Sequence, residues 1–220
     1  MDEMFDLPLF PLHTVLFPGM PLPLHIFEVR YKEMIRFCLE NRQSFGVVLI
    51  REGQEANGPL AEPYRIGCTA RILEVQPQDQ GSMNLITLGE SRIRIHALSF
   101  EQPYLVGKVE LFPLQEDDPA KLSQLSMKLS PLVGQYMQLL NQVEEVELDP
   151  SGLPEDPIVL AYLAAVLLQV PPMIKQDLLS IERSADFLSA LKGVYRREIP
   201  LVRAQLAWAS GAGERKTPLN

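Results

Sequence analysis

The chain has 220 residues, 46% of them hydrophobic and 22% charged, which is typical of a globular protein long enough to bury a core without disulfides or metal. Its formal net charge of −8 disfavours long-range attraction to nucleic acid and to anionic membranes. The longest apolar run, residues 158–168, is shorter than the ~20 residues that span a bilayer, and the acidic start is unlike a secretory signal. We therefore expect a cytoplasmic protein.

The opening segment, residues 7–31, combines apolar side chains with five prolines. Each proline fixes φ and removes a backbone donor, which argues against a helix and favours edge strands and tight turns. Residues 17–20 predict a turn, with Pro18 at the second position and Gly19 free to take a positive φ. The apolar residues then change to helical spacing, which predicts an amphipathic helix. Its apolar face carries Tyr31, Met34, Ile35, Cys38 and Leu39.

The rest of the first half predicts strands separated by loops that are rich in glycine and proline. The expected strands are residues 45–50, 66–75, 84–88, 91–96 and 104–111. Within 91–96, Ile93 and Ile95 alternate with Arg92, Arg94 and His96, a pattern typical of a strand with one solvent-facing side. Many short strands with turn signals between them indicate a closed or nearly closed barrel.

The second half follows an acidic stretch at 113–119, and its apolar residues recur at helical spacing. We expect Pro131 and Pro200 to kink or break the helices that contain them. Asp156 and Pro157 predict a helix start with the aspartate as N-cap, and Ser184 is a candidate cap for the next helix. Residues 209–220 are expected to form a disordered tail.

Three pieces of the opening segment occur in the same order in a known family. They are Leu-Pro-Leu-Phe-Pro-Leu at 7–12, Phe-Pro-Gly-Met at 17–20 and Phe-Glu-Val-Arg-Tyr at 27–31. In these pieces the chain resembles the N-terminal, substrate-binding domain of Lon proteases. Stretches at 66–75, 84–96 and 103–110 look similar as well, so the resemblance covers roughly residues 7–206.

The resemblance implies an α+β fold, in which a small N-terminal β-barrel of the PUA-like, Lon N-terminal type is followed by a C-terminal α-helical bundle. Combined with the composition shift near 113–119, it predicts a barrel domain at 1–117 and a helical bundle domain at 118–208, followed by the tail. Cys38 falls on an apolar helix face and Cys68 in a strand-like run, so both are expected to be buried thiols, although the sequence also permits a disulfide between them.

The sequence shows no motif of an ATPase, a protease or a metal site. The string nearest to a phosphate-binding loop, 211–217, lacks the glycine before its lysine, and no stretch resembles the serine–lysine peptidase domain of Lon proteases. His13, His25 and His96 are scattered without metal-ligand spacing. The carboxylate runs lie in expected linkers. We therefore expect no enzyme, no metal and no cofactor, in a chain that resembles the Lon recognition domain standing alone.

Charged residues in the first half allow two interpretations each. Glu28 and Arg30 could contact a ligand, but the helix dipole favours a carboxylate at a helix start and Arg30 can pair with a carboxylate, so we favour a structural role. Cations on the expected strands could form a basic strip for RNA, but acidic residues occupy the same region and aromatic residues are sparse. These cations are Arg65, Arg71, Arg92, Arg94 and Lys108.

The opening segment also carries more large apolar residues than strand alternation can assign to one core. Most of them should be buried, and any that stay exposed would form a patch for a partner. Candidate contacts are Phe17, Met20 and Phe27; methionine at a turn can adapt to varied partners. If Phe27 is instead a core residue, its replacement by alanine would cost about 3–5 kcal/mol.

The resemblance implies a non-enzymatic protein that binds unfolded or exposed polypeptide segments in a bacterial cytoplasm. The alternatives are a PUA-like RNA-binding module, which the negative charge disfavours, and an accessory subunit that docks on a protease. A homo-oligomer is compatible with any of these. No membrane partner is expected.

Overall fold

A computed structural model describes residues 4–53, 61–144 and 147–213 and divides the chain into two compact units. The first unit, called here the sheet unit, runs to Leu114 and also includes Gln169–Glu182. The second, the helical unit, comprises Gln115–Leu168 and the segment from Arg183 onward. The division at 114 lies close to the expected boundary at 117. The expectation of two continuous domains differs from the structure, however, because residues 169–182 return to the sheet unit.

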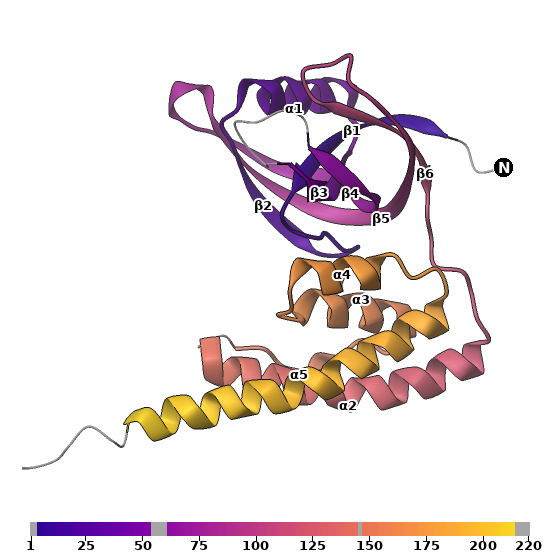
Figure 1. Ribbon diagram of the computed structural model, residues 1–220, viewed down its shortest axis with the longest axis vertical. Helices are drawn as coiled ribbons and strands as arrows, with labels where there is room; N and C mark the ends of the chain where they lie inside the picture. Colours follow the sequence, from indigo (N-terminus) through magenta and orange to yellow (C-terminus); the bar gives the residue numbers. More distant parts are fainter. Residues whose placement is uncertain (1–3, 54–60, 145–146, 214–220) are drawn as a thin grey trace, which may run out of the picture. The chain divides into compact units, whose positions relative to one another are not determined.

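The sheet unit contains six strands in the order β2-β5-β4-β3-β1-β6. Their bounds are β1 Phe5–Leu12, β2 Pro21–Ile26, β3 Phe45–Glu52, β4 Glu62–Pro77, β5 Met83–Ser99 and β6 Leu105–Leu111. β1 and β3 are parallel and the other pairs are antiparallel. Because β6 pairs with β5 as well as with β1, five of these strands form a ring of pairings, outside which β2 adds to β5 (Figure 1).

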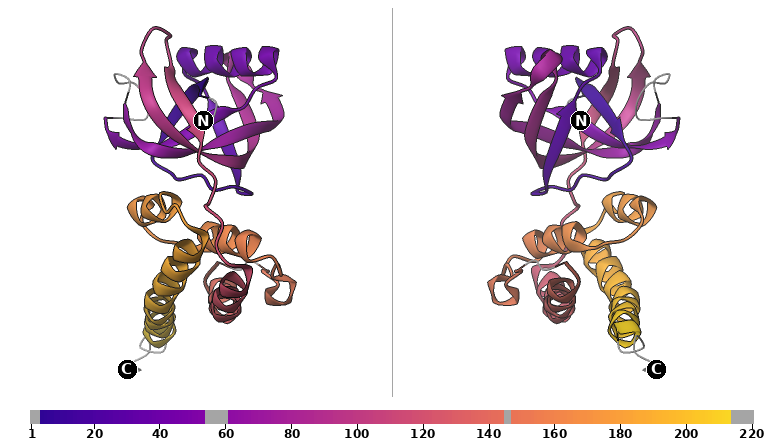
Figure 2. Two further views of the ribbon diagram at one scale, coloured as in Figure 1. Left: turned by 90° about the vertical axis from the view of Figure 1, so that its right-hand side faces the viewer. Right: turned by 90° about the vertical axis from the view of Figure 1, so that its left-hand side faces the viewer.

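Strand β5 is the longest element of this sheet, and it joins the two separate strands that the sequence predicted at 84–88 and 91–96. A one-turn 3₁₀ helix, η1 (Asp79–Gly81), connects it to β4. β5 pairs with β2, β4 and β6, with register shifts between Cys68 and Ala70 and between Ile95 and Ala97. Bulges of this kind bend and twist a strand, which allows one strand to follow the curvature of the sheet (Figure 2).

Two apolar clusters fill the sheet unit, and the alternation of β1 separates them. Leu9 packs with residues of β3, β5 and β6, whereas Phe10 faces helix α1 (Val29–Asn41), with its ring 4.2 Å from that of Tyr31. The inward face of α1 consists of Tyr31, Met34, Ile35 and Cys38, as the helical spacing predicted. Leu39, the fifth residue of that pattern, is 43% exposed.

The predicted turn at 17–20 is present. The Met20 N–H donates to the Phe17 carbonyl at 3.0 Å, and Gly19 has φ of 79°, which suits a type II turn with Pro18 at its second position. The turn lies on Gly89, where a Cβ would meet the Phe17 oxygen at 2.2 Å, so only glycine allows this close approach.

Helix α4 (Pro172–Leu179) belongs to the sheet unit because its C-terminal end is bound by an arginine from β5. Arg92 Nη1 donates to the carbonyls of Leu179 at 2.7 Å and Ile181 at 2.5 Å. Gln176 Nε2 donates to the Ile66 carbonyl at 3.0 Å. The sequence assigned this helix to the bundle, since a local pattern cannot show which surface a short helix covers.

The expectation of a solvent-facing side at 91–96 is therefore wrong at Arg92, which is only 3% exposed. Its guanidinium lies over the Phe112 ring, 4.6 Å from the centroid. Arg94 does reach solvent, stacks on the same ring at 4.0 Å and pairs with Glu182 at 2.7 Å and Glu110 at 3.4 Å. Strand alternation placed these arginines on one side, but it could not show that α4 covers part of that side.

The helical unit contains α2 (Pro119–Glu144), the 3₁₀ turn η2 (Pro150–Gly152), α3 (Pro157–Leu167) and α5 (Ser184–Gly213). The rings of Tyr136 on α2 and Tyr195 on α5 meet edge to face at 5.2 Å, and the Tyr195 hydroxyl donates to the Ala164 carbonyl on α3 at 2.8 Å. The predicted N-cap Asp156 is confirmed: its carboxylate accepts from the backbone of Ile158 and Val159.

Two prolines were expected to kink or break their helices, but α2 continues through Pro131 and α5 through Pro200. Both prolines are exposed, so the carbonyl that each leaves without a helical donor lies on a side that water can reach. α2 packs against α5, and residues of α2 beyond Pro131, such as Val133 and Tyr136, are buried, which stabilises this helix past its proline. The prediction of breaks at these positions is wrong, and at Pro131 tertiary packing outweighs the local penalty.

The start of α5 also differs from expectation. Ser184 Oγ donates to the Gln115 carbonyl at 2.6 Å instead of capping, and the Ala185 N–H is bound by the carboxylate of Asp117 at 3.0 Å. α5 continues to Gly213, so residues 209–213 are helical and do not belong to a tail. Residues 214–220, the remainder of the predicted tail, lie outside the described residues.

Candidate functional site

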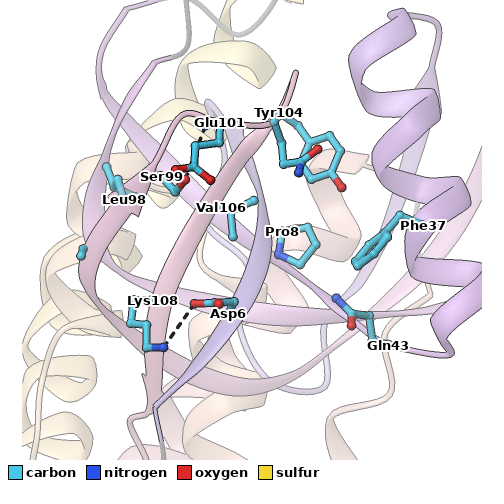
Figure 3. Close-up of a pocket in the computed structure, with 12 residues that line it drawn as sticks. Asp6, Pro8, Phe37, Gln43, Leu98, Ser99, Glu101, Tyr104, Val106 and Lys108 are labelled. Atoms are coloured by element: carbon cyan, nitrogen blue, oxygen red, sulfur yellow. Dashed lines mark hydrogen bonds and ion pairs between the residues drawn. The ribbon is translucent and has the colours of Figure 1, made fainter.

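The candidate site is a groove on the sheet unit, formed where β1, β5 and β6 pair beside the end of α1 (Figure 3). Its cavity volume is about 480 Å³. The antiparallel register places Asp6 opposite Lys108 and Pro8 opposite Val106. Since directly opposed residues share a face of the sheet, these side chains form one surface. The lining residues are Asp6, Pro8, Phe37, Gln43, Ala97, Leu98, Ser99, Glu101, Gln102, Tyr104, Val106 and Lys108.

The middle of the groove is apolar. Pro8 is buried in β1, and Val106 on β6 is half-buried and packs against the core cluster beneath α1. Phe37 projects from α1 beside them and remains 40% exposed (Figure 3). Phe37 lies outside the inward stripe of α1, so the core does not need it. The arrangement offers a seat for an apolar side chain.

Polar groups flank this apolar middle. Lys108 pairs with Asp6 at 3.6 Å, and both side chains are well exposed. The Glu101 N–H donates to Ser99 Oγ at 3.4 Å in the connection between β5 and β6. Tyr104 is buried, and burial is the main reason that its pKa is raised, with smaller contributions from Cys38 and Glu33. The groove can therefore bind apolar groups and can discriminate charge at its edges.

The three residues that the sequence proposed as contacts do not line this groove. Phe17 is completely buried, so it cannot contact a partner from this position. Met20 is half-buried and packs against the core cluster under α1. Phe27 is 50% exposed and stacks on the His25 ring at 6.0 Å, so the alternative assignment of Phe27 to the core is wrong.

The groove residues were missed because no local pattern connects them. Positions 6–8 and 106–108 are brought together by register, which the sequence does not state. One signal was available: Phe37 is a large aromatic residue out of phase with the apolar face of its helix, and such a residue is a candidate for a surface contact.

Most of the charged candidates are paired or buried. Arg30 pairs with Glu28 at 3.0 Å, as favoured from the sequence. Among the cations considered for RNA, Arg92 is buried, and Arg71 pairs with Glu90 at 2.7 Å. Two more are paired with carboxylates: Arg94 with Glu110 and Glu182, and Lys108 with Asp6. The expected strands therefore do not present a continuous positive surface.

The two cysteines are unpaired buried thiols, and burial raises the pKa of both Cys38 and Cys68 to about 12. Among the described residues, no group of three or more histidine, cysteine, aspartate or glutamate side chains could hold a metal ion. No helix within the described ranges has the length and apolar character needed to cross a membrane.

Comparison with known proteins identifies the family. The model of the substrate-binding domain of ATP-dependent protease La (Lon) matches residues 6–191, which is most of the chain. The chain belongs to this family. The Lon protease of Anaeromyxobacter dehalogenans (strain 2CP-C) is 28% identical over 197 residues, and Lon protease 2 of Myxococcus xanthus is 27% identical over 175 residues. These matches cover 87% and 79% of this chain.

Solved structures show the same fold. A Lon N-terminal domain protein from Xanthomonas campestris is 27% identical and superposes with a TM-score of 0.60, covering 85% of this chain and 96% of that one. The N-terminal domain of a Mycobacterium avium complex Lon protease gives 0.68 at 19% identity, covering 87% and 98% of the two chains. The chain thus has the Lon N-terminal domain fold, a mixed α/β structure. It spans only 23% and 21% of the two curated Lon proteases.

Proposed function

We propose that this protein is a recognition module that binds unfolded or exposed polypeptide segments in the groove between α1 and the β1–β6 pair, without catalysing a reaction. The observation that carries the proposal is the apolar middle of the groove, where Phe37 is 40% exposed beside the half-buried Val106 and the buried Pro8, on a domain whose family is defined by substrate binding. An exposed apolar surface on a folded domain is typical of a partner site.

We also propose two features of the fold that the sequence predicted, a small barrel in the sheet unit and a helical bundle in the helical unit. The ring of strand pairings supports a small barrel of the PUA-like kind, and the packed helices α2, α3 and α5 support a bundle. Two unpaired thiols suit a reducing cytoplasm. Action as a stand-alone module and docking on a protease are both predictions compatible with this groove.

The edge of β2 argues against strand addition as the mode of binding there. Pro21 and Pro23 lie opposite Leu88 and Ile86 of β5, and neither proline has an N–H. A peptide strand that paired along the outer edge of β2 would find no donor at these two positions. Prolines on an edge strand commonly protect it from such pairing. We therefore propose the groove, and not the edge of β2, as the binding site.

The test is fluorescence anisotropy of a labelled, permanently unfolded polypeptide, compared with a labelled structured RNA, each over a salt series. The proposal expects saturable polypeptide binding that survives salt, because apolar contacts are not screened. Phe37→Ala should weaken it. Leu39→Ala is the matched control, since Leu39 lies on the same helix at 43% exposure, compared with 40% for Phe37, but outside the groove.

Two results would contradict the proposal. RNA binding that collapses with salt, without polypeptide binding, would favour the nucleic-acid alternative. Equal losses of polypeptide affinity in Phe37→Ala and Leu39→Ala would show that the groove is not the binding site. Phe27→Ala, measured in the same series, tests whether Phe27, which the sequence predicted as a contact, also contributes to polypeptide binding.

A further inference from the structure

The charges that line the groove are not balanced. Lys108, the cation of the lining, is already paired with Asp6. The Glu101 carboxylate makes no hydrogen bond or ion pair with any of the described residues, although its backbone N–H is bound by Ser99. A carboxylate without a counterion beside an apolar seat presents a negative charge to whatever occupies the groove (Figure 3).

A second carboxylate, outside the lining, acts electrostatically on a residue of the groove. Glu33, on α1, is close enough to Tyr104 to contribute to the raised pKa of that phenol. Tyr104 in turn lines the groove near Glu101 (Figure 3). The whole chain adds to this local field, because its net charge is −8. A partner that carries positive charge is therefore attracted during its approach and after it has bound.

We propose that the groove selects polypeptide segments in which a lysine or arginine adjoins an apolar side chain. This specificity rests on the proposed function of the groove. The apolar side chain occupies the seat formed by Phe37, Pro8 and Val106, and the neighbouring cation faces Glu101. The same carboxylates repel phosphate groups, so the charge pattern favours a cationic peptide over a nucleic-acid strand.

The expected preference is modest, because Glu101 is exposed to solvent. Exposed ion pairs change affinity by about 1.5- to 5-fold, and salt reduces the effect. The apolar contact therefore determines whether a segment binds, and the carboxylate determines which of two equally apolar segments binds better. This separation allows the two proposals to be tested independently.

The experiment measures the affinity of three labelled peptides that share one apolar centre and differ in the flanking residues, which are lysine, glutamine or glutamate. The proposal expects the order lysine, glutamine, glutamate, with about 1.5- to 5-fold between neighbours at low salt and convergence at high salt. Glu101→Gln should reduce the ratio between the lysine and glutamine peptides. Glu74→Gln, the control, removes the same charge from an exposed position on β4 outside the groove and should preserve the ratio.

Each remaining outcome is decisive. If the three peptides bind equally well, the charge preference is wrong while polypeptide binding stands. If Glu74→Gln reduces the ratio as much as Glu101→Gln does, the preference belongs to the net charge and the proposal for Glu101 fails. If none of the peptides binds, both this inference and the proposed function are overturned.

Discussion

Arg92 connects β5 to the end of α4, and its replacement tests why residues 169–182 belong to the sheet unit. In Arg92→Leu, the carbonyls of Leu179 and Ile181 lose the guanidinium that binds them at 2.7 and 2.5 Å. Hydrogen bonds to a charged group contribute about 1.5–3 kcal/mol each. Leucine recovers part of the apolar burial, so we expect a net loss of about 3–4 kcal/mol from the free energy of unfolding of the sheet unit.

The control variant changes Arg94, which lies two residues from Arg92 on the same side of β5. Arg94 pairs with Glu110 and Glu182, and all three side chains reach solvent. Exposed ion pairs contribute about 0–1 kcal/mol, so Arg94→Gln should change the stability little. The two variants remove the same charge two residues apart, one from a buried arginine that binds backbone carbonyls and one from an arginine that reaches solvent.

The assay is urea unfolding combined with amide hydrogen exchange of residues 172–182. Arg92→Leu should lower the unfolding midpoint and accelerate exchange in α4 well before the rest of the sheet unit, because local opening requires less energy once its anchor is lost. Equal stability losses in the two arginine variants, or unchanged exchange in α4, would refute the assignment of Arg92 as the anchor.

Three further predictions follow from burial and charge. Phe27→Ala should cost only about 1 kcal/mol, since half of the ring is exposed, whereas the fully buried Phe45→Ala should cost about 3–5 kcal/mol; urea unfolding of both compares them directly. Cys38 and Cys68, with pKa values raised to about 12, should resist iodoacetamide at pH 8 in the folded protein and react after unfolding, and rapid native labelling would contradict their burial. The Ala185 N–H and then the Arg183 guanidinium hold the pKa of Asp117 below 3.8, so the carboxylate stabilises the folded protein above pH 3.8 and this contribution is lost as the pH falls through 3.8 and below. In Asp117→Asn the unfolding midpoint should therefore fall less steeply over an acidic pH series than in the unsubstituted protein. Identical slopes would disprove the stabilising role of Asp117.

Features set by neighbouring residues could be read from the sequence. The turn at 17–20 follows from Pro18 and Gly19, whose φ preferences are intrinsic, and the start of α3 follows from Asp156 directly before a proline. The inward face of α1 follows from its helical spacing. In each case the pattern that predicts the structure is contained within a short stretch of consecutive residues.

Features set by distant residues could not be read in this way. Pro131 lies inside a continuous helix because α2 packs on α5. The N–H of Ala185, in the first turn of α5, donates to the carboxylate of Asp117, which lies 68 residues earlier in the chain. Arg92 is buried by a helix far along the chain. The groove depends on the register of β1 against β6, which places Pro8 opposite Val106. A pattern in consecutive residues carries no information about these pairings.

Binding of unfolded polypeptide in the groove beside α1 can be mapped by amide hydrogen exchange of the protein with and without a saturating unfolded polypeptide. We expect slower exchange in β6, in the connection from Ser99 to Tyr104 and at the C-terminal end of α1, with little change along the edge of β2. Protection confined to β2, or to the helical unit, would contradict binding in the groove.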